Sequence, residues 1–436
     1  MNRQRVVVTG MGTVNPLGST VSRFWERCVK GASGVGTVTA FPIPEHMSRI
    51  AGMVQGPGEH ELRTIFDDVD EAARLDRSLV FALLATRSAI SDAGLGSEDL
   101  SGDGPARNAV VISTAIAQIA RMELAFCRQT GMGSRPIGPP RSRTKGGCNN
   151  FFFNTTSGEL ARFFGINGRA VTTATGCTGG VDALGHAFQL IRSGKVELVI
   201  AGAAEAPITP LVVAAFSKIG ATSLRNHAPA EASRPFDRDR DGFVLAEGCA
   251  IVVLESLEHA LERGARIYAE ITGFSSVNNH YHMTDIPEDG SSIARSCSAA
   301  LADAGIDAEA VDFVNAHGSS TPQNDVAEAN ALRLVFGERS RRIPVTSVKS
   351  QTGHGLSAAN SIELVASVLT IRDGVIPPTI NLEVQDEHCP LDVVANEARP
   401  SPVGCVVKIS SGFSGIHSAM IIERYNPVRP RARRSA

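Results

Sequence analysis

The sequence predicts an α/β protein with substantially buried strands, and two observations lead to this fold class. Short β-branched runs alternate with longer amphipathic stretches along most of the chain. The strand-like runs are continuous in apolar residues, as is typical of strands that helices cover on both faces. With 436 residues, 43% of them hydrophobic, the chain also has enough core for one large domain or two fused ones.

The individual elements follow from these runs in order along the chain. The expected strands are residues 6–9, 109–112, 198–201 and 250–254, and the expected helices include residues 179–193 and 290–304. Residues 128–150, rich in Gly, Pro, Arg and Ser, predict a surface loop, as do residues 224–243. The basic end of the chain, 426–436, predicts a flexible tail.

Composition argues against several classes of function. The formal net charge of −3 gives no general attraction for nucleic acid. The eight cysteines form no C-x-x-C pair, which argues against a zinc site and fits a reducing cytosol. Asp237–Gly242 imitates the start of a calcium loop, but Gly248 stands where that loop needs an acidic residue. The apolar runs are too short for a signal peptide or a membrane span. We therefore expect a cytoplasmic protein with no metal, no nucleic-acid partner and no membrane contact.

A short internal similarity predicts that the fold is duplicated. Residues 171–177 read Val-Thr-Thr-Ala-Thr-Gly-Cys and precede a helix that closes near Gly194. Residues 345–354 read Val-Thr-Ser-Val-Lys-Ser-Gln-Thr-Gly-His and precede a helix that closes near Gly374. Each copy has a strand, a Thr-Gly pair, a reactive residue and a helix ended by glycine. A duplicated fold would bring the two helix starts together.

Cys177 is the first candidate for chemistry, because it stands where a helix begins. Free N–H groups and the helix dipole favour the thiolate there, and the thiolate is the nucleophilic form. Gly176, Gly179 and Gly180 permit a sharp turn and a close approach of the backbone. A lone cysteine is more often a small buried packing residue, so Cys177 needs supporting residues before it counts as catalytic.

Two histidines supply that support. His317 follows an apolar strand in a loop of small polar residues, and His354 opens the second of the two similar helices. A neutral imidazole at a helix N-terminus resists protonation, so it can donate a hydrogen bond without becoming a cation. Lone histidines are more often structural, but two of them in glycine-containing loops at strand ends favour catalysis.

Five motifs occur in order along the chain: Gly176-Cys177, Arg234-Pro-Phe-Asp237 with Asp241-Gly-Phe243, Tyr281-His-Met-Thr284, Asn315-Ala-His-Gly318 and Lys349-Ser-Gln-Thr-Gly-His354. On these motifs nearly the whole chain resembles the β-ketoacyl synthase family, the decarboxylating condensing enzymes of thiolase-like fold. The resemblance implies two pseudo-equivalent halves in α-β-α-β-α layers. The N-terminal half, 1–262, would carry the nucleophilic cysteine, and the C-terminal half, 263–425, the two histidines and Lys349.

Within the family, the chain looks most like the ketosynthase alpha subunit of type II polyketide synthases. Thr175-Gly-Cys-Thr-Gly179 and the segment 410–420, Ser-Ser-Gly-Phe-Ser-Gly-Ile-His-Ser-Ala-Met, are nearer to that group than to fatty acid synthases. The sequence departs from the family pattern at three places: Ser319 replaces a common Thr, Ser414 follows Phe413 where Gly is usual, and residues 115–118 lack frequent glycines.

The resemblance implies a role for each candidate residue. Cys177 would take an acyl group from an acyl carrier protein, with the backbone N–H groups of Cys177 and Phe413 as oxyanion hole. His317 and His354 would stabilise the enolate that malonyl carrier protein forms when it loses carbon dioxide. No cofactor is expected on the enzyme, since the carrier protein brings its own phosphopantetheine. The residues expected to bind that arm and the acyl chain are Ser319, Thr321, Thr284, Phe216 and Phe413, with Met122 as a weaker candidate.

Lys349, Glu328 and Glu363 would orient the two histidines, the alternative being a buried ion network without a role in the reaction. The resemblance also implies a heterodimer with a chain-length-factor subunit, formed along a strand near residues 166–175. A homodimer that elongates fatty acids is the first alternative. A non-elongating partner subunit is the second, against which the retained Cys177 argues. A thiolase is the third, against which the pair of histidines argues.

Overall fold

One continuous sheet connects the two halves of the molecule. In residues 3–101, 107–136 and 152–428, which the computed structural model describes, eleven strands form one sheet in the order β12-β10-β9-β14-β15-β8-β1-β7-β6-β4-β5. The strands of the N-terminal half are β1 (Val6–Val14), β4 (Asn108–Ser113), β5 (Arg169–Thr173), β6 (Leu198–Glu205) and β7 (Gly248–Ser256). Those of the C-terminal half are β8 (Ala269–Asn278), β9 (Phe313–Asn315), β10 (Pro344–Thr346), β12 (Asp392–Val393), β14 (Cys405–Gly412) and β15 (Ile416–Glu423).

The two halves of this sheet repeat one arrangement. In the N-terminal half, β5, β4 and β6 pair in parallel, and β7 and β1 then continue antiparallel. In the C-terminal half, β10, β9 and β14 pair in parallel, and β15 and β8 then continue antiparallel. The halves join where Val6–Val8 of β1 meets Ala269–Ile271 of β8. The duplication expected from the internal similarity is therefore confirmed.

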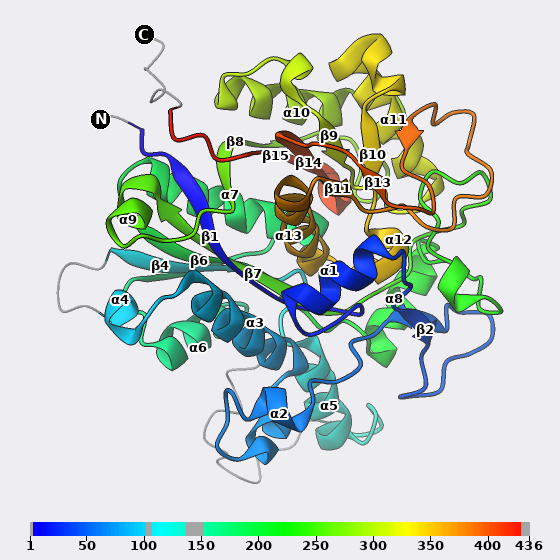
Figure 1. The fold of residues 1–436 in the computed structure, drawn as a ribbon. Helices are drawn as coiled ribbons and strands as arrows, with labels where there is room; N and C mark the ends of the chain where they lie inside the picture. The colour runs from blue at the N-terminus through cyan, green and yellow to red at the C-terminus, as the bar shows by residue number, and fades with distance from the viewer. Residues whose placement is uncertain (1–2, 102–106, 137–151, 429–436) are drawn as a thin grey trace.

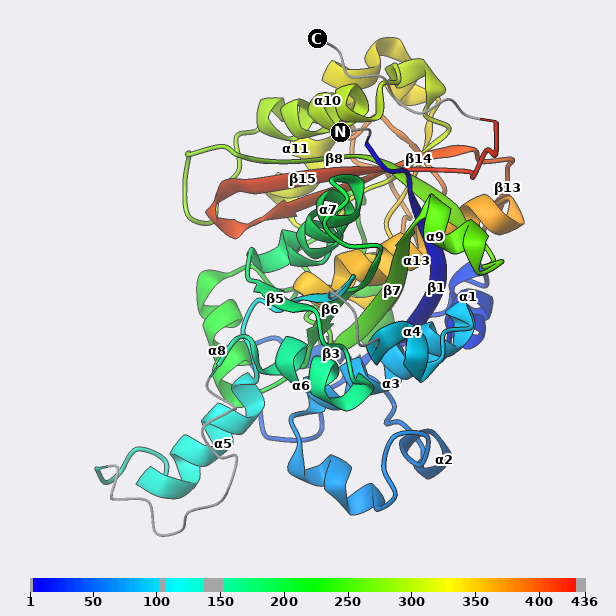
Figure 2. The same cartoon turned by 90° about the vertical axis from the view of Figure 1, so that its left-hand side faces the viewer.

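Helices cover both faces of each half, which produces five layers (Figure 2). Helices α3 (Arg77–Ala93) and α6 (Thr155–Phe164) pack on the outer face of the N-terminal strands. Helices α7 (Gly179–Arg192) and α13 (Ser357–Asp373) lie between the two halves of the sheet. Helices α10 (Ser291–Ala304) and α11 (Pro322–Phe336) cover the outer face of the C-terminal strands. The α-β-α-β-α arrangement is thus present. The four predicted strands fall inside these strands, and the predicted helices 179–193 and 290–304 match α7 and α10 to within one residue.

Shorter elements fill the connections and the edges (Figure 1). They are α1 (Val21–Val29), β2 (Val35–Thr37), β3 (Ile50–Gly52), α2 (Glu59–Leu62), α4 (Ser97–Ser101), α5 (Ile119–Thr130), α8 (Pro210–Ile219), α9 (Leu257–Glu262), α12 (Lys349–Thr352), β11 (Val375–Ile376) and β13 (Arg399–Pro400). Among the described residues, no helix has the length and apolar character that crossing a membrane requires.

The two central helices cross closely at their N-terminal ends, and glycine makes this possible. A Cβ atom on Gly180 would lie 2.5 Å from the carbonyl oxygen of Ser357, and one on Gly179 would lie 2.9 Å from the Cβ of the same serine. Both distances are shorter than side chains tolerate, so only glycine lets α7 meet α13 here. The glycines after Cys177 therefore bring the start of one central helix against the start of the other.

The expectation of a surface loop at 224–243 holds for residues 224–231, which are exposed or half-buried, but is wrong for most of residues 232–243. The segment is irregular, but Ser233 to Asp237 and Phe243 are buried. Its polar groups find partners inside the protein: Arg234 pairs with Asp237 at 2.9 Å, and Asp237 also accepts backbone N–H groups from Glu383 and Val384. Glu383 and Val384 are remote in sequence from Asp237, which explains why composition alone did not reveal this burial. The other expected loop, 128–150, overlaps the end of α5, and residues 137–151 and 429–436 lie outside the described residues.

Candidate active site

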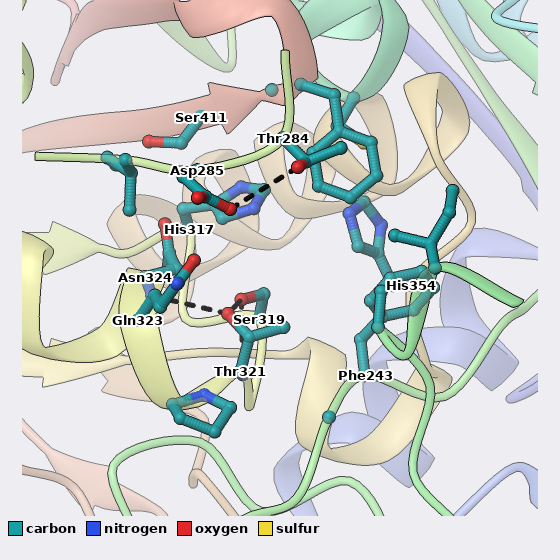
Figure 3. Close-up of a pocket in the computed structure, with 18 of the residues that line it drawn as sticks. Phe243, Thr284, Asp285, His317, Ser319, Thr321, Gln323, Asn324, His354 and Ser411 are labelled. Carbon is teal, nitrogen blue, oxygen red and sulfur yellow. Dashed lines mark hydrogen bonds between the residues drawn. The ribbon is translucent and has the colours of Figure 1, made fainter. Parts of the chain in front are cut away.

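A cavity of about 350 Å³ opens at the starts of the two central helices and takes its lining from both halves (Figure 3). Seven residues singled out from the sequence line it: Cys177, Thr284, His317, Ser319, Thr321, His354 and Phe413. Residues more than 200 positions apart in the sequence thus reach one space because the duplicated strand–turn–helix units meet there.

Cys177 lies in a short 3₁₀ turn, Gly176–Thr178, between β5 and α7. Gly176 has φ +61°, a left-handed conformation that favours glycine and turns the chain sharply. Asp182, in the first turn of α7, accepts hydrogen bonds from the hydroxyls of Thr175 and Thr178 at 2.5 and 2.6 Å. This carboxylate therefore fixes the residues on both sides of the nucleophile, a role that the sequence analysis missed.

The thiol of Cys177 is protonated in the resting protein, contrary to the expectation of a ready thiolate. Burial raises its pKa to about 11, and the neighbouring Lys349 charge and the backbone N–H groups of Phe413 and Cys177 only partly oppose this. Removing water from around an anion outweighs the favourable position near the helix start. A nucleophilic role for Cys177 would therefore require the loss of this proton when a substrate arrives.

The two backbone N–H groups expected to form an oxyanion hole do converge at Cys177. Those of Phe413 and Cys177 both act on the Cys177 thiol and lower its pKa. The end of β14 lies directly against the nucleophile turn, since a Cβ on Gly412 would be 3.5 Å from the backbone nitrogen of Cys177. The carbonyl of Cys177 accepts hydrogen bonds from the side chains of Asn360 on α13 and Ser410 on β14.

His354 is a neutral donor whose tautomer the structure indicates. The backbone N–H of Leu356 donates to its Nδ1 at 3.2 Å, so the single proton of the neutral ring sits on Nε2. Burial, followed by the charges of Lys349 and Lys408, holds its pKa well below the usual value. The residue precedes α13, which begins at Ser357, so it lies in the turn before the helix rather than in its first turn.

His317 follows β9 and lies beside His354, with ring centroids 5.4 Å apart (Figure 3). Its pKa is also held well below the usual value by burial, with Lys349 and His354 adding to the effect. Among the described residues, its buried Nδ1 has no hydrogen-bond partner. Two neutral imidazoles therefore stand next to the cysteine in the same cavity.

The predicted supporting residues hold the backbone of His317 rather than its ring. Glu328 accepts the backbone N–H groups of His317 and Gly318 at 2.6 and 2.8 Å. Lys349 donates to the carbonyl oxygen of His317 at 2.7 Å and to Glu363 at 2.6 Å. The ion network is therefore buried, and it holds the backbone at His317 and Gly318.

The predicted arm-binding residues lie at the cavity, with two exceptions. The hydroxyls of Ser319 and Thr321 are 2.8 Å apart, and Thr284 lies in the lining as well. Phe216 does not reach the cavity: it packs at 5.6 Å on Phe243, whose ring lies 5.1 Å from that of His354. Met122 lies on α5, outside the cavity lining.

The acidic segment that imitates a calcium loop is occupied by other contacts. Asp237 is committed to Arg234 and to backbone N–H groups, and Asp241 accepts the backbone N–H of Leu224. Within the described part of the chain, no three His, Cys, Asp or Glu side chains are grouped so as to hold a metal ion.

Comparison with known proteins gives matches along the chain. Residues 3–260 match the family described as "Beta-ketoacyl synthase, N-terminal domain", and residues 268–383 match "Beta-ketoacyl synthase, C-terminal domain". "Granaticin polyketide putative beta-ketoacyl synthase 1" of Streptomyces violaceoruber is 40% identical over 427 residues, which cover 97% of this chain and 98% of that protein. "3-oxoacyl-[acyl-carrier-protein] synthase 2" of a Synechocystis strain is 39% identical over 430 residues, 98% of this chain and 99% of the relative.

Two solved structures have closely similar folds. One is the AntDE:AntF complex, a type II polyketide acyl-carrier protein with its ketosynthase bound to the hexaketide; it is 41% identical, with a TM-score of 0.89, over 97% of this chain and 100% of the other. The other is the ishigamide ketosynthase/chain length factor, which is 33% identical, with a TM-score of 0.86, over the same shares of the two chains.

Proposed function

The chain belongs to the β-ketoacyl synthase family, and on this premise we propose that it extends a polyketide chain by decarboxylative condensation with malonyl-acyl carrier protein. The observation that carries the proposal is the meeting of one cysteine and two neutral imidazoles in a single cavity. The cysteine supplies a covalent anchor for the growing chain. The imidazoles supply hydrogen bonds for a developing anion, so each half-reaction has its own residues.

In the loading step, the sulfur of Cys177 attacks the thioester carbonyl of an acyl carrier protein. The backbone N–H groups of Cys177 and Phe413 hold the resulting oxyanion. The tetrahedral intermediate then expels the thiol of the carrier, so the thiol proton of Cys177 leaves on the phosphopantetheine sulfur. The products are acyl-Cys177 and free carrier protein.

In the condensing step, the thioester oxygen of malonyl carrier protein accepts hydrogen bonds from His317 and His354. Loss of carbon dioxide leaves an enolate, which these donors stabilise in a site shielded from water. The enolate carbon attacks the carbonyl of acyl-Cys177, a carbon–carbon bond forms, and the carbon–sulfur bond breaks. Cys177 leaves as a thiolate and takes up a proton, which restores the resting thiol.

The mouth of the cavity fits the arm that carries the substrate. Ser319, Thr321 and Thr284 present hydroxyl groups along its lining, which suits the amides of phosphopantetheine. Lys349, Glu328 and Glu363 position His317 through its backbone. We place the boundary between the halves at 262/263, where α9 ends and the chain turns toward β8.

Polyketide extension is favoured over the alternatives. The relatives named as polyketide synthases or polyketide β-ketoacyl synthases, and the type II polyketide ketosynthase structure at 41% identity, support it over fatty-acid elongation. The relatives named "3-oxoacyl-[acyl-carrier-protein] synthase 2" are nearly as similar, which agrees with a shared reaction. A non-elongating subunit is disfavoured because Cys177 lies in a complete site.

The partners proposed for this chain are an acyl carrier protein and a related chain-length-factor subunit. The described edge of the sheet ends at β5, directly before the nucleophile turn. A second subunit that pairs there would lie next to the acyl chain on Cys177. One similar structure is named as a ketosynthase with a chain length factor, and another as a ketosynthase in complex with its carrier protein.

Replacing the nucleophile tests this proposal. Cys177→Ala, purified with its partner subunit, should give no acyl adduct on the enzyme and no lengthened chain on the carrier protein by intact-mass analysis. Cys127→Ala on α5, which removes a half-buried cysteine outside the cavity, should keep both. Persistence of the acyl adduct in Cys177→Ala would show that another residue is the nucleophile.

A further inference from the structure

Lys408 is a fully buried lysine that the proposed reaction does not use. It lies on β14, five residues before Phe413, and its side chain is 0% exposed. Its Nζ lies 2.7 Å from Glu363 Oε2 and donates to the carbonyl oxygens of Ala316 and Ile409 at 3.3 and 2.5 Å. A buried ammonium group is costly unless its partners are well placed, so its position here needs a physical reason.

Glu363 connects Lys408 to the active site. One oxygen of this carboxylate lies 2.6 Å from Lys349, and the other lies 2.7 Å from Lys408. The two ammonium groups in turn hold consecutive carbonyls: Lys349 that of His317, and Lys408 that of Ala316. The chain leading out of β9 is therefore held at two successive residues by cations that share one carboxylate.

The charges around Lys408 are unequal. Lys349 from α12 adds a second positive charge, Glu363 from α13 carries one negative charge, and Glu328 from α11 faces the group as well. Burial raises the pKa of Glu328 to about 7, so this carboxyl is only partly ionised near neutral pH. The excess of positive charge helps to keep the pKa of His354 low, and the charges of both lysines act on His317 in the same direction.

We propose that Lys408 is a second positioning residue for the decarboxylation step. Lys408 acts through Glu363 and through the backbone of Ala316 and His317, and so holds the His317 imidazole against the malonyl thioester oxygen. The proposal rests on the function assigned above. Lys408 touches no substrate, since it does not line the cavity. Its positive charge also acts on both imidazoles, which would stabilise the negative charge that the enolate develops next to them.

This role makes the two half-reactions respond differently to pH. Burial lowers the pKa of Lys408 to about 8, although Glu363 opposes this. As pH rises through that value, the group loses its proton, its attraction to Glu363 and its positive charge. Decarboxylation should therefore fall on the alkaline side. Loading of Cys177 should not share this fall, because it gains from loss of the thiol proton as pH rises.

The test compares Lys408→Met with the wild-type enzyme and with Lys195→Met, which removes an exposed lysine after α7. Carbon dioxide release from malonyl carrier protein and single-turnover acylation of Cys177 are each measured from pH 6.5 to 9.5. Lys408→Met should lose about 10-fold to 10²-fold in carbon dioxide release, the range expected when a reacting group is misplaced by up to 1 Å. Its acylation should stay close to wild type, and its alkaline fall near pH 8 should be absent.

Each outcome bears on the proposal. If Lys408→Met releases carbon dioxide at the wild-type rate and keeps the alkaline fall, the role of Lys408 is overturned. The condensing function would then stay intact. A wild-type enzyme without condensation would instead refute the function. If Lys408→Met does not fold, Lys408→Gln, which keeps a donor toward Ala316, replaces it. If neither variant folds, the wild-type profile decides: a fall near pH 8 supports the proposal, and a flat profile up to pH 9.5 overturns it.

Discussion

Each imidazole of the site is prepared as a donor by its own surroundings. At His354 the backbone N–H of Leu356 occupies Nδ1, so the proton is available on Nε2. At His317 the backbone is held by Glu328 and Lys349, while the ring itself stays free to meet a substrate. Because burial keeps the pKa of both histidines well below the usual value, both rings are neutral near neutral pH.

His317→Ala and His354→Ala should each impair condensation more than loading. Losing one donor to a developing anion typically costs about 10²–10³ in rate. Carbon dioxide release and single-turnover acylation of Cys177, measured separately, distinguish the two steps. His186→Ala on α7, a half-buried histidine that does not line the cavity, is the control and should leave both steps unchanged. Equal loss of both steps in both active-site variants would indicate a structural role instead.

Glu205 makes a prediction about stability and pH. This buried carboxyl at the end of β6 accepts hydrogen bonds from the Ala115 backbone and the Ser357 hydroxyl, and burial raises its pKa to about 8. It is protonated in the folded protein but ionised in the unfolded chain above about pH 4.5. The unfolded state then binds fewer protons, so the free energy of unfolding falls as pH rises from about 4.5 to 8.

Glu205→Gln removes this pH dependence while keeping the shape of the side chain. Thermal midpoints of wild type and variant are compared at pH 5.5 and pH 8. The difference in thermal midpoint, variant minus wild type, should be more positive at pH 8 than at pH 5.5. Glu338→Gln, at an exposed glutamate, should show no such difference. An equal shift at both pH values would mean that Glu205 is ionised in the folded protein.

At the scale of elements, the turn between β14 and β15 decides where the Phe413 N–H group points. Ser414 has φ +65°, unusual for a residue with a side chain, and Gly415 follows with φ +73°. A Cβ on Gly415 would lie 1.9 Å from the side-chain oxygen of Asn279. The turn is therefore held in one conformation by a close contact with the loop after β8.

Gly415→Ala should displace this turn and slow acylation of Cys177, because the Phe413 N–H group would move away from the oxyanion. The matched control is Gly264→Ala, whose φ of +67° carries the same backbone strain but whose Cβ would meet nothing within 4 Å. The control should lose only about 1 kcal/mol of stability and no acylation rate. Equal acylation in both variants would show that the turn tolerates the clash or that Phe413 is not a donor.

Prediction from sequence succeeded where a local pattern determines the structure. The strand, the Thr-Gly pair and the following helix are local, so both copies of this unit and the residues Cys177 and His354 were found. The burial of Ser233 to Asp237, the acid Asp182 and the lysine Lys408 were not. Asp237 accepts backbone N–H groups from Glu383 and Val384, and Lys408 pairs with Glu363, so both depend on partners distant in sequence. Asp182 has partners near in sequence, Thr175 and Thr178, but no motif in the sequence marks it. The protonation of Cys177 was mispredicted because burial decided it.

At the scale of the whole molecule, β5 makes the assembly testable. It pairs only with β4 among the described strands, and its first residues are exposed in the isolated chain. An open sheet edge of this kind favours pairing with another chain. We expect a stable one-to-one complex with a related subunit that lacks the cysteine, and little activity without it. Light scattering and condensation assays of the chain expressed alone and together with that subunit give the answer. A fully active homodimer of this chain would contradict the heterodimer and favour fatty-acid elongation.

The position of the last two strands has a consequence for the making of the protein. β14 and β15 are last in the sequence, yet they lie between β9 and β8 in the middle of the C-terminal half of the sheet. While the chain emerges from a ribosome, β8 and β9 have no strand between them until residues 405–423 have been made. Phe413 belongs to the same late hairpin. Pairing across such long separations is slow. The proposed reactive centre is therefore completed only after residues 405–423 have been made, and a shorter nascent chain carries Cys177 without the Phe413 N–H group.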